Sequence, residues 1–185
     1  LKGVLTACGF YEAITLSFVA PRLNELFPGL GVDGQAVTVA NPINRDESEM
    51  RRSLLGGLIA TWRTNRNQGA KGLSAFTTGR VFWRSDGPQE GWRLGGIMAG
   101  ELPRRGLGTA RAVEFGDLKG VVEALLDCLR IADRVRWDRW EGAPFHAGKT
   151  ARLRCGEDVV GVAGAYWTIL QLQAFTTVLG LGGAI

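Results

Sequence analysis

The sequence predicts an α+β domain in which an antiparallel β-sheet is flanked by helices. Its strand-like segments come in consecutive runs and do not alternate strictly with helices, which favours an antiparallel sheet over a doubly wound parallel one. Two longer segments carry apolar residues at helical spacing. The length of 185 residues, with 45% hydrophobic and 22% charged residues, is typical of one soluble domain with a sizeable core.

The N-terminal forty residues predict two short helices and two strands. The chain starts with a pattern typical of the last turns of a helix, and Gly9 suits the left-handed position that ends it. Alternation over 10–19 predicts a strand, one face of which is made by Phe10, Ile14, Leu16 and Phe18. Pro21 suits the first position of the second helix, and residues 36–40 predict the second strand.

A central amphipathic helix is predicted over 53–67. Apolar residues recur on one helical face, namely Leu54, Leu55, Leu58, Ile59 and Trp62. Ser53 is the expected N-cap, and the sequence Asn67-Gln68-Gly69 is a plausible end.

The second half of the chain predicts the rest of the sheet and one more long helix. A polar turn around Asp86 separates two strands, 73–83 and 93–101. Apolar spacing from Leu118 to Leu129 predicts the helix, and Asp117 is expected to cap its N-terminus or to interact with its dipole. Short strands are then predicted at 134–140, 150–155 and 158–166.

The C-terminal segment from Val159 to Ile185 carries no charge and is long enough to span a bilayer. Two glutamines, three threonines and five glycines within it suit buried sheet better than hydrocarbon. We therefore expect no membrane contact.

Two glycine motifs lack the sequence context that nucleotide or phosphate binding requires. Residues 29–34 fit GxGxxG, but a helix precedes them and a strand follows, the reverse of what a dinucleotide site needs. Gly148-Lys149-Thr150 resembles the end of a phosphate loop, but the glycine required five positions before Gly148 is Ala143. His146 is the only histidine, and no GxSxG elbow is present. We expect no catalytic residue, cofactor site or metal site in this chain.

Arg51 and Arg52 lie directly before the central helix, where an arginine could hold a phosphate or carboxylate in bidentate fashion. The alternative is a salt bridge to Asp46, Glu47 or Glu49, and the sequence favours it.

The segment 134–140, RVRWDRW, mixes arginines with two tryptophans. Such a mixture occurs on surfaces that bind single-stranded nucleic acid, but a strand with an apolar inner face has the same pattern. The net charge of +4 permits contact with a polyanion without requiring it. Three cysteines without a CxxC pair suit a reducing compartment, and no signal peptide is apparent, so we expect a cytoplasmic location.

Five segments resemble one family in its order along the chain. The residues that match its motifs most directly begin with Gly9, Phe10, Glu12 and the run 15–18; they continue with Asn41, Pro42, Arg51, Ser53, Gly79, Arg80, Asp117, Lys119, Gly120, His146 and Gly148. Together these segments resemble the catalytic-core-like domain of the bacterial phenylalanyl-tRNA synthetase β subunit.

The resemblance implies a class II aminoacyl-tRNA synthetase-like core that has lost catalysis. It implies a scaffold for the catalytic α subunit in an (αβ)₂ assembly, which uses ATP and magnesium to charge tRNA(Phe). The motif residues above, including Arg51, would then be structural. The family's acid in the motif before Gly79 is Thr77 here, which agrees with a loss of nucleotide binding.

The resemblance runs from residue 1 to about 165, which we take as one core domain. Residues 166–185 match nothing in the family pattern, and we expect them to continue the same domain. Gly56 and Ala147 stand where the family has proline.

The resemblance also suggests where another subunit would bind. Class II cores pair through the first helix and strand, here Leu1 to Val19. The odd-numbered face of that strand is small and semi-polar, and we expect it to contact the α subunit. Its residues are Tyr11, Ala13, Thr15 and Ser17. The alternative is that this face carries a helix of its own domain.

Two other functions remain open at this point. A stand-alone class II-like nucleotide-binding protein would need an acid and an arginine that grip phosphate, which Thr77 disfavours. A basic RNA-binding module is supported by the pI near 9.3.

Overall fold

The computed structural model describes residues 1–29, 33–102, 109–146, 148–167 and 173–180. Its helices are α1 (Lys2–Ala7), α2 (Pro21–Leu26), α3 (Leu55–Asn67) and α4 (Phe115–Cys128), followed by a short 3₁₀ helix at Ala132–Arg134. Gly9 follows α1 with φ +87°, and proline opens α2, both as predicted.

Two long strands form the centre of the sheet, and shorter strands extend it. The long pair is β4 (Gly72–Arg84) and β5 (Pro88–Leu102). The shorter strands are β1 (Tyr11–Glu12), β2 (Phe18–Val19), β3 (Glu49–Met50), β6 (Arg111–Ala112), β7 (Val135–Arg139), β8 (Thr150–Cys155), β9 (Asp158–Trp167) and β10 (Gln173–Gly180).

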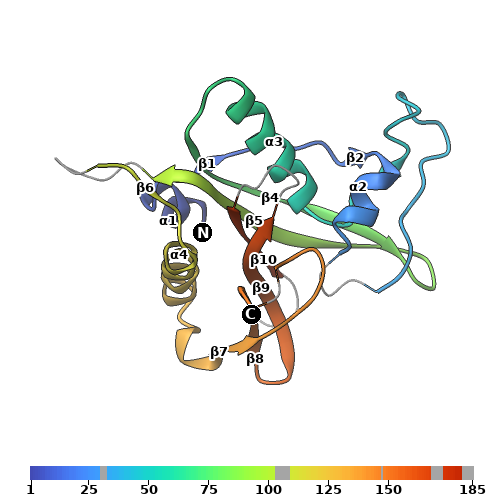
Figure 1. Ribbon diagram of the computed structural model, residues 1–185. Helices are drawn as coiled ribbons and strands as arrows, with labels where there is room; N and C mark the ends of the chain where they lie inside the picture. The colour runs from blue at the N-terminus through green and yellow to red at the C-terminus, as the bar shows by residue number, and fades with distance from the viewer. Residues whose placement is uncertain (30–32, 103–108, 147, 168–172, 181–185) are drawn as a thin grey trace.

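The main sheet is almost entirely antiparallel and has the order β1-β4-β5-β10-β9-β8-β7, with β6 beside β5. The exception is β1, which runs parallel to β4. β10 comes last in the chain but lies between β5 and β9, and pairs antiparallel with both. The sequence predicted buried sheet for this segment but not its place in the strand order, which is the middle of the sheet (Figure 1).

Helices cover the two faces of the sheet. On one face, Leu58 and Trp62 of α3 pack on Ala75 and Ile97. On the other face, α1 and α4 pack on residues of the opposite parity in the same strands, such as Phe76 and Met98. The main core lies on this second face, between α4 and the sheet. These two layers confirm the predicted α+β class.

Two strand predictions were wrong. The segment 10–19 is not one strand: only β1 and β2 are paired, and the chain between them leaves the sheet. Residues 36–40 form a single bridge, from Thr38 to Glu49, and their backbone bonds go to 48–50. Apolar and polar residues do alternate in both segments. Much of their backbone, however, is hydrogen-bonded to residues 48–51, outside the main sheet.

The predicted start of the central helix is also corrected. The helix begins at Leu55 with Leu54 as N-cap, and the Ser53 hydroxyl accepts a hydrogen bond from the Leu55 N–H at 3.2 Å. Ser53 therefore stabilises the turn that enters the helix. Among the described residues, no helix has both the length and the apolar character needed to cross a membrane.

Candidate subunit-contact segment and its arginine anchor

The segment 10–19, here called the contact segment, crosses the start of α3. Its first part is held to the sheet by the Ala13 N–H, which donates to the Phe76 carbonyl at 2.7 Å. Beyond Ala13 the chain rises over α3, where Gly57 lets it come close. A Cβ on Gly57 would lie 2.8 Å from Cβ of Thr15, too near for any side chain.

Arg51 fastens the contact segment to the domain. Its Nη1 donates to the carbonyl and hydroxyl oxygens of Thr15 at 3.0 and 2.9 Å, and to the Leu16 carbonyl at 3.4 Å. Its Nε donates to the Arg80 carbonyl of β4 at 2.9 Å. The Arg51 backbone N–H also binds the Ser17 carbonyl. One buried arginine thus joins three segments that are far apart in sequence.

Arg51 is largely withdrawn from solvent. The residue is only 7% exposed, and burial lowers the pKa of its guanidinium. A Cβ on Gly79 would lie 2.2 Å from Arg51 Nη2, so glycine is required where β4 passes the guanidinium. The interpretation of Arg51 as structural fits this geometry.

The salt bridge expected for Arg51 is not formed. All of its side-chain acceptors are oxygens of Thr15, Leu16 and Arg80, and none is a carboxylate. The nearby Glu49 accepts a hydrogen bond from Asn24 instead. Backbone carbonyls of an irregular segment need donors, and the planar guanidinium supplies several of them at once.

The outward side of the contact segment is strongly apolar. Ile14 is 97% exposed, Leu16 71% and Phe18 46%, and Tyr11 at the start of the segment is 75% exposed. These four residues are called the apolar ridge below. The prediction that Phe10 shares one face with Ile14, Leu16 and Phe18 was wrong, since Phe10 alone of the four is buried.

Three of the four odd-numbered residues predicted for subunit contact are half-buried against their own domain. Ala13 packs beside Leu58 and Trp62, Thr15 binds Arg51, and Ser17 is half-buried; only Tyr11 is largely exposed. α3 and Arg51 hold the small, semi-polar side of the segment, as in the alternative that this face carries a helix of its own domain. The small side chains of Ala13, Thr15 and Ser17, together with Gly57, were the signals for this close packing.

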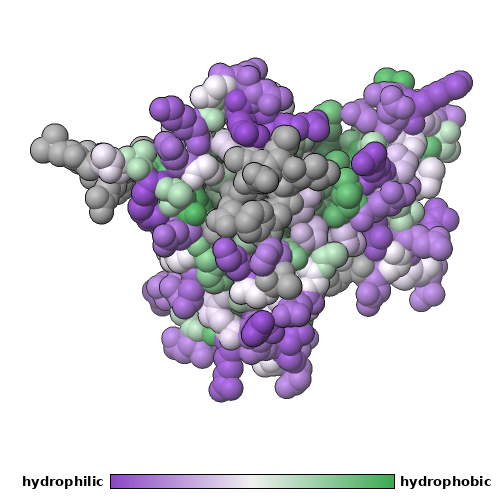
Figure 2. Space-filling view, in the orientation of Figure 1, coloured by the Kyte–Doolittle hydropathy of each residue, from purple (hydrophilic) through white to green (hydrophobic). Residues whose placement is uncertain are grey.

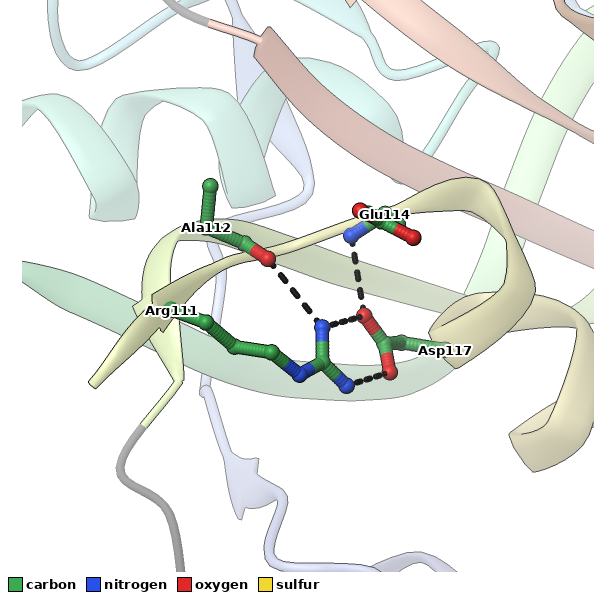
Figure 3. A network of polar contacts seen from close by, with 4 residues as sticks. All are labelled: Arg111, Ala112, Glu114 and Asp117. Atoms are coloured by element: carbon green, nitrogen blue, oxygen red, sulfur yellow. Dashed lines mark hydrogen bonds and ion pairs between the residues drawn. The ribbon is translucent and has the colours of Figure 1, made fainter. Parts of the chain in front are cut away.

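Asp117 caps α4 as predicted, within a polar network at the helix start (Figure 3). Its carboxylate accepts the Glu114 N–H at 2.9 Å and forms a bidentate pair with Arg111. The guanidinium of Arg111 lowers the pKa of Asp117. Lys119 and Gly120 follow in the helix, and Lys119 pairs with Glu123 and lies over the Trp137 ring.

The remaining motif residues lie in turns and at strand edges. Asn41 is exposed and Pro42 is half-buried, in the connection before β3. Arg80 is exposed on β4, where it pairs with Glu90. His146 is exposed, but its backbone N–H and carbonyl bind Ala165 and Thr150. Gly148 has φ +81°, which explains the glycine.

Two of these motifs meet across a cavity of about 510 Å³. Val113, Glu114 and Phe115 line one side, and residues 148–151 line the other. The sequence motifs around Asp117 and Gly148 are thus neighbours in space. Among the described residues, no group of three or more His, Cys, Asp or Glu side chains could hold a metal ion.

The architecture is that of a class II aminoacyl-tRNA synthetase core. The structure is similar to a pyrrolysyl tRNA synthetase, PylSc of Desulfitobacterium hafniense, with a TM-score of 0.68 and 16% identity. The similarity covers 98% of this chain and 63% of that one. At this level of identity it shows the fold alone.

Sequence comparison narrows the class to one family. The model of the phenylalanyl tRNA synthetase beta chain CLM domain matches residues 1–167, and the chain belongs to this family. It is 34% identical over 163 residues to the phenylalanine–tRNA ligase beta subunit of Moorella thermoacetica, covering 85% of this chain and 20% of the relative. For the beta subunit of Geobacter metallireducens the identity is 34% over 170 residues, covering 89% and 21%.

A third relative gives the same result. The beta subunit of Carboxydothermus hydrogenoformans is 33% identical over 178 residues, covering 92% of this chain and 22% of the relative. The chain therefore spans about a fifth of the length of these relatives.

Proposed function

We propose that this chain is a non-catalytic, core-like part of a phenylalanine–tRNA ligase β subunit that scaffolds the catalytic α subunit. The assembly would be an (αβ)₂ heterotetramer that binds ATP and magnesium and charges tRNA(Phe) in the cytoplasm. The chain itself would hold no cofactor and contribute no catalytic residue. The observation that carries the proposal is the apolar ridge, which an isolated domain would leave in water.

The ridge has the character of a protein contact. Single exposed hydrophobic residues are common on soluble proteins, but here four large ones are exposed within eight consecutive residues. The segment that carries them is fixed by Arg51 from below, so it is presented as a rigid surface. A preorganised apolar surface loses little conformational entropy on association.

The two positions at which a nucleotide site would need an arginine and an acid support a scaffold function instead. Arg51 donates its hydrogen bonds to protein oxygens, so this guanidinium is committed to the fold. Thr77 stands at the position of the family's acid and is buried at 3% exposure. Together these features support a core that has kept its architecture and its contact surface while losing its chemistry.

Co-expression with the α subunit of the same source tests the proposal. We expect a tagged chain to retain the α subunit through affinity purification and gel filtration, as one complex with both chains in equal amounts. Recovery of the two chains in separate fractions, with the tagged chain folded by circular dichroism, would refute the scaffold function.

A further inference from the structure

The hairpin of β7 and β8 places three arginines on one face. Arg136 and Arg154 lie directly opposite each other in the antiparallel pairing, and Arg152 lies two residues along β8 on the same side. The opposite face carries Val135, Trp137 and Leu153, which pack against the core under α4. Like charges directly opposite each other destabilise a strand pair, so the arrangement calls for an explanation.

The acids near these arginines do not use up their hydrogen-bond donors. Asp138 Oδ2 lies 3.7 Å from Arg152 Nη2 and 3.9 Å from Arg154 Nε, beyond hydrogen-bond distance. Glu157 binds only Nη2 of Arg154. The Nε atoms of Arg152 and Arg154 are buried without a hydrogen-bond partner, and Arg136 forms no ion pair with any residue that the structure describes.

The face that carries the arginines is partly accessible. Arg136 is exposed on the edge strand β7, and the side chains of Arg152 and Arg154 are 30% and 27% exposed. On this side of the sheet α3 covers β4 and β5, and its Leu55 and Ile59 reach Val162 of β9, the strand partner of Arg152. In Figure 2 the lower end of the molecule, over β7, β8 and β9, is covered mostly by hydrophilic side chains. The RVRWDRW pattern is thereby explained in part: Trp137 belongs to the core face and Trp140 packs on Phe145. Arg154 also binds the Glu157 carbonyl in the turn after β8, whereas neither core packing nor an aromatic contact explains Arg136 and Arg152.

We propose that Arg136, Arg152 and Arg154 form an oxyanion site that binds the phosphate backbone of an RNA duplex. The guanidinium fork matches phosphate oxygens, and cross-strand and i,i+2 neighbours present three forks within a few ångströms of one another. A phosphate would satisfy the unpartnered donors and relieve the repulsion between the arginines. The choice of RNA as the source of the phosphate rests on the proposed function; the site itself rests on the contacts above.

Fluorescence anisotropy with a labelled RNA duplex tests the site, using the chain alone and its complex with the α subunit. Arg136→Gln and Arg152→Gln are each expected to weaken binding about 3- to 10-fold, and each to reduce the slope of log K against log salt by about 1. Arg152→Lys, which keeps the charge but loses the fork, should also weaken binding. The matched controls are Arg63→Gln and Arg66→Gln on α3, which should have much smaller effects.

The outcomes separate the alternatives. Equal losses in the control variants would show diffuse attraction by net charge and overturn the site. Unchanged binding in Arg136→Gln, an exposed position whose substitution leaves the fold intact, would overturn it as well. Stabilisation by inorganic phosphate that is lost in Arg136→Gln, without any effect on RNA affinity, would assign the site to a small anion instead. Retained association of these variants with the α subunit would show that the scaffold function is independent of the result.

Discussion

At the residue scale, Arg51 shows why a conspicuous sequence feature can mislead. An arginine pair before a helix suggests a phosphate site, and three nearby acids suggest a salt bridge. The structure shows neither, because the irregular contact segment presents three carbonyls that need donors inside the protein. Sequence patterns cannot reveal this need, since it arises only when residues 15–17 leave the sheet.

Replacement of Arg51 by Met should therefore destabilise the domain strongly. The substitution keeps an apolar stem but leaves the carbonyls of Thr15 and Arg80 buried without donors, at a cost on the order of 3 kcal/mol. The free energy of unfolding in urea measures the effect. Arg63→Met, at an exposed position of α3, is the control and should change stability by less than about 0.5 kcal/mol. Similar values for both variants would contradict the anchor role.

Asp117 gives a prediction with a defined pH dependence. Because the pKa of Asp117 is lowered in the folded protein, its contribution is present above the pKa of the unfolded chain, near 3.8, and is lost as the pH falls through the folded value. Asp117→Asn should lower the melting temperature near pH 7 and have little effect at about pH 2. Melting curves of both proteins between these pH values provide the test. A difference that is equally large at both ends would show that the ionised network of Figure 3 does not stabilise α4.

At the element scale, long periodic segments were predictable and short ones were not. The apolar stripes of α3 and α4 and the β4–β5 pair were predicted from their spacing, because many residues contribute to each signal. The prediction for the contact segment was wrong because its alternation was interpreted as one continuous strand with Phe10 on the same face as the later large side chains. In fact the small side chains of Ala13 and Thr15 face α3, and the large ones face outward.

The phase of α3 gives a direct stability prediction. Leu58 is fully buried, whereas Thr64 is exposed on the other side of the helix. Leu58→Ala should cost about 2–5 kcal/mol of unfolding free energy, because it leaves a cavity between α3 and the sheet. Thr64→Ala should change it little, and both are measured by urea denaturation. Equal shifts of the urea midpoint would mean that the helix is rotated from the position described.

At the scale of the whole molecule, the chain keeps the class II architecture and carries two surfaces of opposite character. The apolar ridge lies on the segment that crosses α3. The face that carries Arg136, Arg152 and Arg154 lies on β7 and β8, at the end of the strand order opposite to β1. The fold class could be predicted from the succession of elements. The position of β10 in the sheet could not be predicted. Its segment carries no charge, so its sequence does not indicate which strands it pairs with.

The chain is also expected not to bind ATP. We expect this because the Nε and Nη1 donors of Arg51 are engaged by the protein, and because Thr77 stands where the family motif has an acid. Calorimetric titration with ATP and magnesium should show no binding, and the complex with the α subunit is the positive control. A dissociation constant in the micromolar range for the chain alone would contradict the loss of nucleotide binding.

The most direct test of the account is the affinity of the chain for the α subunit after charges are placed on the apolar ridge. Ile14→Asp and Leu16→Asp change exposed side chains, so the variants should remain folded. We predict that each weakens association at least about tenfold, as loss of a buried apolar anchor does. Ile43→Asp is the matched control, an equally exposed isoleucine outside the ridge, and should leave association unchanged. Sedimentation velocity across a concentration series measures all three. Folded ridge variants that associate like the unsubstituted chain, or an equal loss in Ile43→Asp, would contradict the assignment of the ridge as the subunit contact.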